Sequence, residues 1–230
     1  MSKTKIPWCD YTINPVKGLC PMACSYCYAR RMYKRFKWNP EIRFTPGAMP
    51  DMMNMPDGSK VFWGSTFELF HDSVPNSWRE IIFYNAKIFD NLTHIFLTKQ
   101  PQNLIKLSPF PDNCWVGVTI TDPYPDNTPL AYLAKVEAKV KYISFEPLLK
   151  WGTDLSSVLK LSFEKAGISW VILGSQTQPT RHPSREWVDE IITAADKAGI
   201  PVFVKEPMAS HFNIHRQEFP VIASTKGEEG

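Results

Sequence analysis

Three cysteines lie close together near the start of the chain, and they are the residues best suited to chemistry. Cys20, Cys24 and Cys27 follow the pattern C-x3-C-x2-C, and Tyr26 directly precedes the last of them. Three thiolates on one short loop can hold three irons of a four-iron cluster, which leaves the fourth iron open to a small molecule. A cluster that only carries electrons is usually held by four cysteines. The spacing therefore predicts a [4Fe–4S] cluster at a reaction centre.

Two alternatives to this interpretation stay open. Three cysteines and a histidine can bind a structural zinc ion, although all five histidines are distant from the triad in sequence. A fourth thiolate from Cys9 would close the cluster and leave no open iron. The remaining cysteine, Cys114, opens an apolar run, and we expect it to be a buried structural thiol.

The elements that must position this loop are predicted from hydrophobic patterns, in which short apolar runs alternate with helical stretches. Strands are expected at residues 10–14, 60–64, 94–98, 114–120, 140–145, 168–173 and 200–204. Helices are expected at residues 24–36, 75–89, 102–107, 129–137, 154–166 and 184–198. This alternation favours βαβ units and a parallel sheet. We predict an α/β fold, a single β/α barrel domain over residues 1–224, partial or nearly complete, with a flexible tail at residues 225–230. An open doubly wound sheet is the alternative.

Polar side chains gather at one end of the predicted strands. In β/α barrels the chemistry lies at the C-terminal ends of the strands. The candidate site residues at those ends are Ser65, Thr66, Glu68, Lys99, Thr119, Glu146, Gln176 and Lys205. Glu146 follows an apolar run, so its carboxylate needs a partner or a ligand, and Lys99 and Lys205 are the two candidate partners. We expect these three residues to carry the catalytic contacts.

Composition and charge set broader bounds. The chain has 230 residues, of which 43% are hydrophobic, so it can bury a substantial core. A formal net charge of +3 is too small to indicate nucleic-acid binding by itself. No long apolar run and no apolar signal core are present, so we expect no membrane span and a cytoplasmic location. Clustered cysteines are also typical of a reducing compartment.

One segment concentrates the positive charge. Basic residues follow the cysteines directly, with aromatic residues between them: Arg30, Arg31, Lys34, Arg35, Lys37 and Arg43. Cations can meet phosphates and aromatic faces can stack on bases, so contact with a nucleic acid through Arg30–Arg43 is one interpretation of the segment, although its residues favour the plainer alternative that follows. A helix with a solvated basic face is the alternative.

The cysteine loop resembles that of the radical SAM superfamily. The resemblance implies that the three thiolates hold the cluster and that its open iron chelates S-adenosylmethionine (SAM). It further implies reductive cleavage of SAM to a 5′-deoxyadenosyl radical, which abstracts hydrogen from a substrate, and an external electron donor of the flavodoxin or ferredoxin type. Tyr26 would then lie near the adenine. Ser65, Thr66 or Glu68 would replace the Gly-Gly-Glu turn that binds the methionine amino group in many members, and Thr119 and Gln176 are candidates for the ribose or adenine.

A narrower resemblance spans most of the chain. Its motifs are Trp8-Cys9-Asp10, Glu68-Leu-Phe70-His71, Leu97-Thr98-Lys99 and Ser144-Phe-Glu146. They resemble a phage-associated family of uncharacterised proteins, which leaves the substrate open. A nucleic acid or nucleotide is the first expectation, followed by a peptide or a small metabolite. A non-catalytic zinc or iron–sulfur binding module is one alternative function, and a cluster-independent barrel hydrolase that uses Glu146 and His71 is another.

Overall fold

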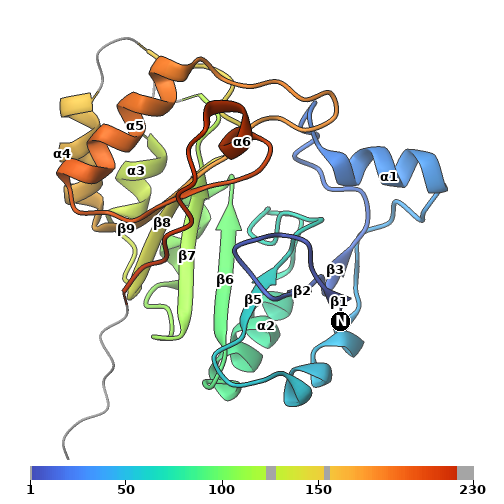
Figure 1. Cartoon of the computed structure of the whole chain (residues 1–230). Helices are drawn as coiled ribbons and strands as arrows, with labels where there is room; N and C mark the ends of the chain where they lie inside the picture. Colours follow the sequence, from blue (N-terminus) through green and yellow to red (C-terminus); the bar gives the residue numbers. More distant parts are fainter. Residues whose placement is uncertain (1, 123–127, 153–155, 222–230) are drawn as a thin grey trace, which may run out of the picture.

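An open eight-stranded sheet forms the centre of the molecule (Figure 1). The computed structural model describes residues 2–122, 128–152 and 156–221, so the tail predicted at residues 225–230 lies outside the described residues. The strands, in their order across the sheet, are β1 (Ser2–Lys3), β2 (Tyr11–Ile13), β5 (Lys60–Trp63), β6 (Thr93–Thr98), β7 (Cys114–Thr119), β8 (Val140–Phe145), β9 (Ile168–Leu173) and β10 (Val202–Val204). β1 is antiparallel to β2, and each further pair of neighbours is parallel.

The helices lie between these strands along the chain. They are α1 (Tyr28–Phe36), α2 (Asn76–Ile88), α3 (Thr128–Leu133), α4 (Ser156–Ala166), α5 (Arg185–Lys197) and α6 (Met208–Phe212). A separate two-stranded sheet pairs β3 (Val16–Lys17) with β4 (Arg43–Phe44). No described helix combines the length and the apolar character that crossing a membrane requires.

The predicted elements agree with the structure except at a few ends. All seven predicted strands are present in the parallel sheet. The helix expected at residues 24–36 begins only at Tyr28, because the residues before it form the cysteine loop. The short helix expected at residues 102–107 is instead two 3-10 turns, Pro101–Asn103 and Ile105–Leu107. Pro101 and Pro109 enclose too few residues there to nucleate a stable α-helix. β1, β3, β4 and α6 were not predicted.

The sheet curves into a half-barrel and does not close. β1 and β10 are its two edges, and no strand pairing between them occurs in the described part of the chain. The partial form of the predicted barrel is therefore correct, and the nearly complete form is not. In Figure 1, the N-terminal segment in dark blue and the C-terminal segment in red run across the open side.

Both faces of the sheet are buried, which explains why its strands read as continuous apolar runs. The outer face packs against the helices through alternate side chains such as Trp63, Phe96 and Phe145. The inner face carries large rings that form a second cluster: Phe62, Trp115, Tyr142, Trp170 and Phe203, together with Trp8 from the N-terminal segment. These rings pack against one another in the interior of the half-barrel.

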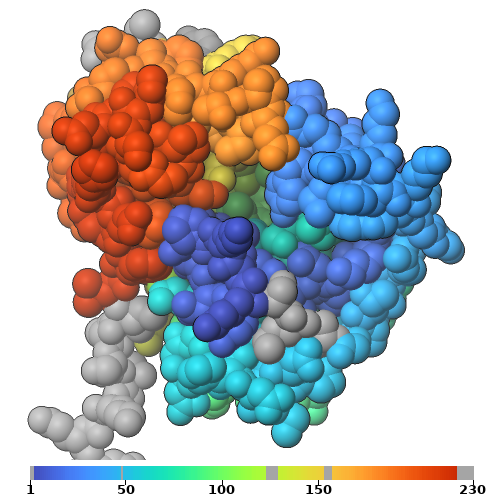
Figure 2. All heavy atoms as spheres, turned by 45° about the vertical axis from the view of Figure 1, so that its right-hand side comes forward, coloured from blue at the N-terminus to red at the C-terminus, as the bar shows by residue number. Residues whose placement is uncertain are grey.

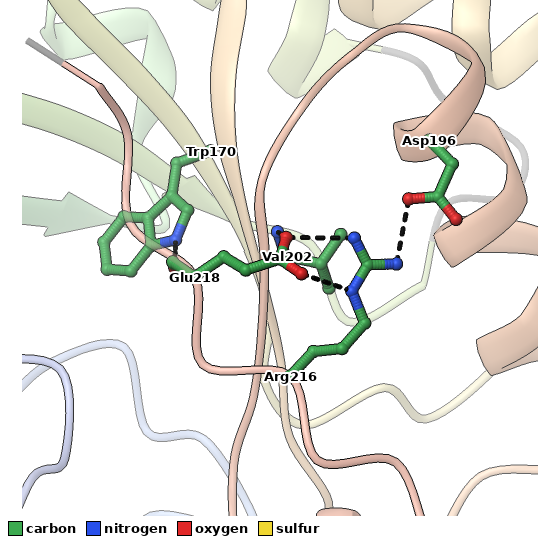
Figure 3. Close-up of polar contacts among 5 residues, drawn as sticks. All are labelled: Trp170, Asp196, Val202, Arg216 and Glu218. Atoms are coloured by element: carbon green, nitrogen blue, oxygen red, sulfur yellow. Dashed lines mark hydrogen bonds and ion pairs between the residues drawn. The ribbon is translucent and has the colours of Figure 1, made fainter.

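A network of polar contacts fastens the C-terminal segment to the sheet (Figure 3). Arg216 donates two hydrogen bonds to the Glu218 carboxylate, at 2.7 and 2.9 Å, and a third to Asp196 on α5, at 2.8 Å. Glu218 also accepts the backbone N–H of Val202 in β10, at 2.9 Å, and its carbonyl accepts the indole N–H of Trp170, at 2.8 Å. The network therefore holds the last strand, its following segment and α5 together.

Replacing Arg216 should weaken this network in a pH-dependent way. The hydrogen bonds from Arg216 lower the pKa of Glu218 from its ordinary value. A carboxylate with a lowered pKa stabilises the fold at pH values above its unfolded pKa, and this contribution is lost as the pH falls through the folded pKa. We expect Arg216→Gln to reduce the free energy of unfolding by roughly 1–2 kcal/mol near neutral pH, and by less near pH 3. Urea unfolding at both pH values measures this difference. Lys160→Gln, which removes an exposed i,i+4 pair with Glu164, is the matched control. An equal loss at both pH values would contradict the assigned role of Glu218.

Candidate active site at the carboxyl ends of the strands

A cavity of about 360 Å³ opens at the carboxyl ends of the parallel strands. The three predicted cluster ligands, Tyr26 and the candidate residues at the strand ends all line it: Cys20, Cys24, Tyr26, Cys27, Ser65, Thr66, Glu68, Lys99, Thr119, Glu146, Gln176 and Lys205. Figure 2 shows a hollow on this side of the molecule, between the orange segment, the blue α1 region and the dark blue N-terminal segment. Parallel strands place all their carboxyl ends on one edge, so residues far apart in sequence meet here.

The cysteine loop is a short irregular segment that ends in a helix. Its turns are closed by backbone hydrogen bonds from Ala23 to the Cys20 carbonyl, at 3.4 Å, and from Cys27 to the Cys24 carbonyl, at 3.1 Å. Ala23 has a φ of 50°, a left-handed conformation that costs a non-glycine residue energy and recurs at functional loops. Cys27 is the residue directly before α1. The positive end of the helix dipole therefore lies next to the thiols and favours negative charge there.

Three side chains from α1 hold this loop in place. Arg30 donates to the Cys20 carbonyl, at 3.2 Å. Arg31 donates to the carbonyls of Tyr26 and Thr177, each at 3.1 Å, and also to that of Gln178. The Tyr28 hydroxyl donates to the Ser65 carbonyl, at 2.9 Å. These contacts join the loop to the segments after β9 and β5, so both arginines have structural roles.

The surroundings of the Cys20 thiol act on its pKa in both directions. Burial raises the pKa of Cys20, while the backbone N–H groups of Glu68 and Met22 lower it by hydrogen bonding to the sulfur. Burial also raises the pKa of Tyr26, and the charge of Cys24 adds to the effect. The Tyr26 hydroxyl hydrogen-bonds with Cys24 and Thr121. It therefore contacts the thiol loop itself.

The three thiols line one cavity. Within the described ranges, no three His, Cys, Asp or Glu side chains are placed to hold a single metal ion. Zinc requires such convergence, because all its ligands bind one ion at about 2.0–2.3 Å. In a [4Fe–4S] cluster each thiolate binds a different iron, so the sulfurs stay apart. Three thiols on one loop match the donor set of such a cluster, with one thiolate for each of three irons.

A buried donor in the cavity wall also suits a bound ligand. Trp8 lines the cavity, is 2% exposed, and its indole N–H has no hydrogen-bond partner among the described residues. A buried N–H without a partner is costly, so this donor is suited to an acceptor on a bound molecule. Cys9, its neighbour, is buried against the inner cluster and does not line the cavity. The structure thus does not bring Cys9 to the triad as a fourth ligand.

Glu68 is held firmly within the cavity wall. One carboxylate oxygen accepts from the Thr98 hydroxyl, at 2.7 Å, and from the backbone N–H of Phe70, at 3.1 Å. The other accepts from the backbone N–H of Lys99, at 2.7 Å. Glu68 thus joins the loop after β5 to the end of β6. A carboxylate accepts about four hydrogen bonds, so capacity for about one ligand donor remains.

The turn after β5 is organised by Asn14, which we did not predict as a site residue. Its side-chain oxygen accepts from the backbone N–H and the hydroxyl of Thr66, at 3.0 and 3.1 Å, and from the Ser65 hydroxyl, at 3.1 Å. Gly64 opens this turn with a φ of 75°, where an added Cβ would lie 2.6 Å from Leu69. Asn14 directly follows β2, so the strand-end rule that found the other residues could have found it.

Glu146 forms its ion pair with Lys205 rather than with Lys99. The Glu146 and Lys205 side chains are 27% and 15% exposed, so the pair is largely shielded from water. Gly174 leaves room for it, because a Cβ there would lie 3.0 Å from the Glu146 side chain. Lys99 instead donates to the Thr119 hydroxyl, at 3.4 Å, and no acidic partner is found for it in the described part of the chain. The Lys99 ammonium is therefore suited to an anionic group of a ligand.

Other polar groups lie at the margin of the site or outside it. The Gln176 side chain donates to the Pro179 carbonyl, at 3.2 Å, so its amide is partly occupied. His71 hydrogen-bonds with Ser73, at 2.9 Å, and does not line the cavity. The structure thus does not bring His71 to Glu146. Cys114 is fully buried in the outer core, as predicted.

Comparison with known proteins agrees with this architecture. The structure is similar to that of a cysteine-to-serine mutant of spore photoproduct lyase, with a TM-score of 0.60 and 14% sequence identity, over 89% of this chain and 79% of that one. At this identity the likeness shows the fold, a partial barrel. No curated protein matches the sequence. One family model matches residues 3–218, nearly the whole chain. By that match, the chain belongs to the family described as protein of unknown function (DUF5131).

Proposed function

We propose that this chain is a radical SAM enzyme whose cluster is held by Cys20, Cys24 and Cys27. One observation carries the proposal: the three thiols of one loop line the same cavity as polar side chains from the ends of the parallel strands. When bound, such a cluster would supply the electron that cleaves SAM to methionine and a 5′-deoxyadenosyl radical.

The half-barrel supports the proposal because a radical SAM enzyme has a similar fold. Spore photoproduct lyase, a radical SAM enzyme, has a similar fold. A shared fold does not transfer a function by itself. The likeness matters here because this chain also carries a three-cysteine loop, between its first parallel strand and α1 and on the wall of the cavity.

Several residues of the cavity are suited to orient SAM. The Lys99 ammonium can meet the carboxylate of the methionine moiety. The remaining lone pair of Glu68, with the hydroxyl groups of Ser65 and Thr66, can accept from its ammonium. Thr119 and Gln176 lie where polar contacts to the ribose or adenine are available, and Tyr26 adds an aromatic face on the cysteine side.

The Glu146–Lys205 pair lies on the same wall and is proposed to contact the substrate. A shielded ion pair keeps both charges oriented, so little reorganisation is needed when a substrate binds. The packed rings of the inner cluster exclude water from the interior of the half-barrel. This exclusion protects a reactive carbon radical from side reactions. The proposal also requires an external electron donor, of the flavodoxin or ferredoxin type.

Anaerobic reconstitution of the full chain tests this function. We expect about four irons per chain, and release of 5′-deoxyadenosine and methionine after addition of SAM and dithionite. Stoichiometric zinc with no iron uptake would contradict the proposal and favour a structural metal module. Iron uptake without any SAM cleavage would favour a non-catalytic iron–sulfur module.

A further inference from the structure

A second and larger cavity adjoins the candidate active site. It has a volume of about 990 Å³ and lies between the N-terminal segment, β2, β3 and α1. Its wall includes Lys5, Lys17, Trp38 and Arg43, and we call it the basic groove. The groove and the site cavity share wall residues, among them Tyr28, Ser65, Thr66 and Lys205. The groove therefore leads to the candidate site.

The charge of the groove is mainly positive. Lys5, Lys17, Arg43 and Lys205 line it, against a single acidic residue, Glu206. Lys205 is paired with Glu146, and Arg43 donates to two backbone carbonyls. Lys5 and Lys17 have no acidic partner in the described part of the chain. Unpaired ammonium groups along a groove attract a polyanion, above all a phosphate backbone.

Aromatic rings border the groove at the same place. Trp38 is 45% exposed and stacks on Phe36, which is 51% exposed, with ring centroids 5.4 Å apart and an interplanar angle of 22°. Large rings left in water at a rim are typical of binding surfaces. Trp38 also lines a third cavity, of about 410 Å³, on whose wall Lys34 lies. Trp38 thus lies on the walls of both cavities, with Lys17 and Arg43 on one wall and Lys34 on the other.

The structure separates the basic residues of α1 by role. Arg30 and Arg31 hold the cysteine loop by bonds to backbone carbonyls. Lys34 and Lys37 have no acidic partner among the described residues. The contacts found for the described residues tie Arg30 and Arg31 to the cysteine loop, whereas Arg35 contacts only the Phe36 ring. Lys34 and Lys37 can therefore be replaced without removing a contact of the proposed cluster loop.

We infer that the basic groove binds a single-stranded nucleic acid and presents one of its bases to the site cavity. Exposed rings stack on bases only where the base faces are free, which a duplex prevents. A base must also leave its stack to reach a reacting group in a cavity. Tyr28 stands where the groove meets the cavity, with its hydroxyl fixed on Ser65, so its ring is placed to stack on that base. This inference rests on the proposed function, because it names the substrate class of that site.

Binding can be tested without the cluster or SAM. Fluorescence anisotropy would follow labelled single-stranded oligodeoxythymidylate and oligouridylate, and a DNA duplex of equal length, across a salt series with the full chain. We expect tighter binding of a single strand than of the duplex. We also expect log K to fall with log salt by about 0.7 per phosphate contact. Trp38→Ala should weaken binding about tenfold, as loss of one base stack does.

Two lysines test the phosphate contribution separately. Lys17→Gln with Lys34→Gln should reduce the salt slope by roughly 1.4, the equivalent of about two phosphates. Tyr84→Ala on α2 is the matched control for Trp38, since Tyr84 is exposed and lies outside the groove. Lys87→Gln with Lys165→Gln controls for the loss of two charges, because both side chains are exposed and lie on α2 and α4.

The possible outcomes separate this inference from the proposed function. Salt-independent binding, equal binding of the duplex, full competition by polyglutamate, or unchanged binding by both sets of variants would each overturn the inference. SAM cleavage could still occur in those cases, and the proposed function would stand. The converse outcome is also possible. If the protein binds a single strand in a way that depends on Trp38 and the lysines but takes up no iron, nucleic-acid binding by the groove is supported and the radical SAM function of the site cavity is rejected.

Discussion

Replacement of Cys24 by alanine is expected to abolish iron retention and SAM cleavage together. Three thiolates bind three of the four irons, so removal of one thiolate leaves the cluster bound by only two protein sulfurs. Cys24 lines the cavity and hydrogen-bonds with the Tyr26 hydroxyl. We expect the visible absorbance of the reconstituted protein to disappear, and 5′-deoxyadenosine release to fall at least a hundredfold, on the order of 3 kcal/mol or more in barrier height.

Cys114→Ala is the matched control for this variant. It also removes one thiol, but Cys114 is buried in the outer core on β7 and does not line the cavity. Its replacement should cost stability, roughly 1 kcal/mol for a small cavity, and leave iron content per folded chain unchanged. If Cys24→Ala kept its iron while Cys114→Ala lost it, the ligand assignment would be wrong.

Replacing either partner of the Glu146–Lys205 ion pair is expected to reduce stability strongly. Removal of one partner leaves a shielded charge without its counterion, which costs more than removal of both. We expect Glu146→Gln and Lys205→Met each to lower the free energy of unfolding by about 1–3 kcal/mol. The double variant should lose less than the sum of the two, because the partners are directly coupled. Urea unfolding of the unmodified protein, the two single variants and the double variant gives the coupling free energy between Glu146 and Lys205.

Activity in the same cycle separates a structural pair from a pair that contacts the substrate. If the two residues only stabilise the wall, the double variant should recover 5′-deoxyadenosine release along with stability. If they contact the substrate, the double variant should remain at least tenfold slower in product formation, although it is folded and still takes up iron. Full recovery of turnover would exclude the proposed substrate contact. Lys99→Met, at the other predicted lysine, should instead weaken SAM binding and leave stability nearly unchanged.

Several features of the site were predictable because they follow from short-range patterns. The cysteine spacing lies within one loop, and the strands are recognised from apolar runs of about six residues. Parallel strands have all their carboxyl ends at one edge, so the rule that selected Glu68, Lys99 and Glu146 also predicted that they would share a cavity. Asn14 obeys the same rule, but the first strand was predicted over residues 10–14, which placed Asn14 inside the strand, whereas β2 ends at Ile13.

Other features depended on distances across the fold. Both Lys99 and Lys205 end a parallel strand, and the curvature of the sheet decided which of them meets Glu146, 59 residues away from Lys205. The roles of the basic segment were equally undetermined, since Arg31 reaches Gln178 across 147 positions while Lys34 stays free of acidic partners in the described residues.

The amino-acid sequence by itself determined the triad of thiols, the alternation of strands and helices, and the polar residues that end the strands. Each of these depends on neighbours a few positions apart, where periodicity and spacing carry the information. Only the tertiary structure decided that the sheet stays open, that Cys9 turns toward the inner rings, and that a basic groove adjoins the cavity. Those outcomes depend on strand register, sheet curvature and packing between distant segments, which no local pattern encodes.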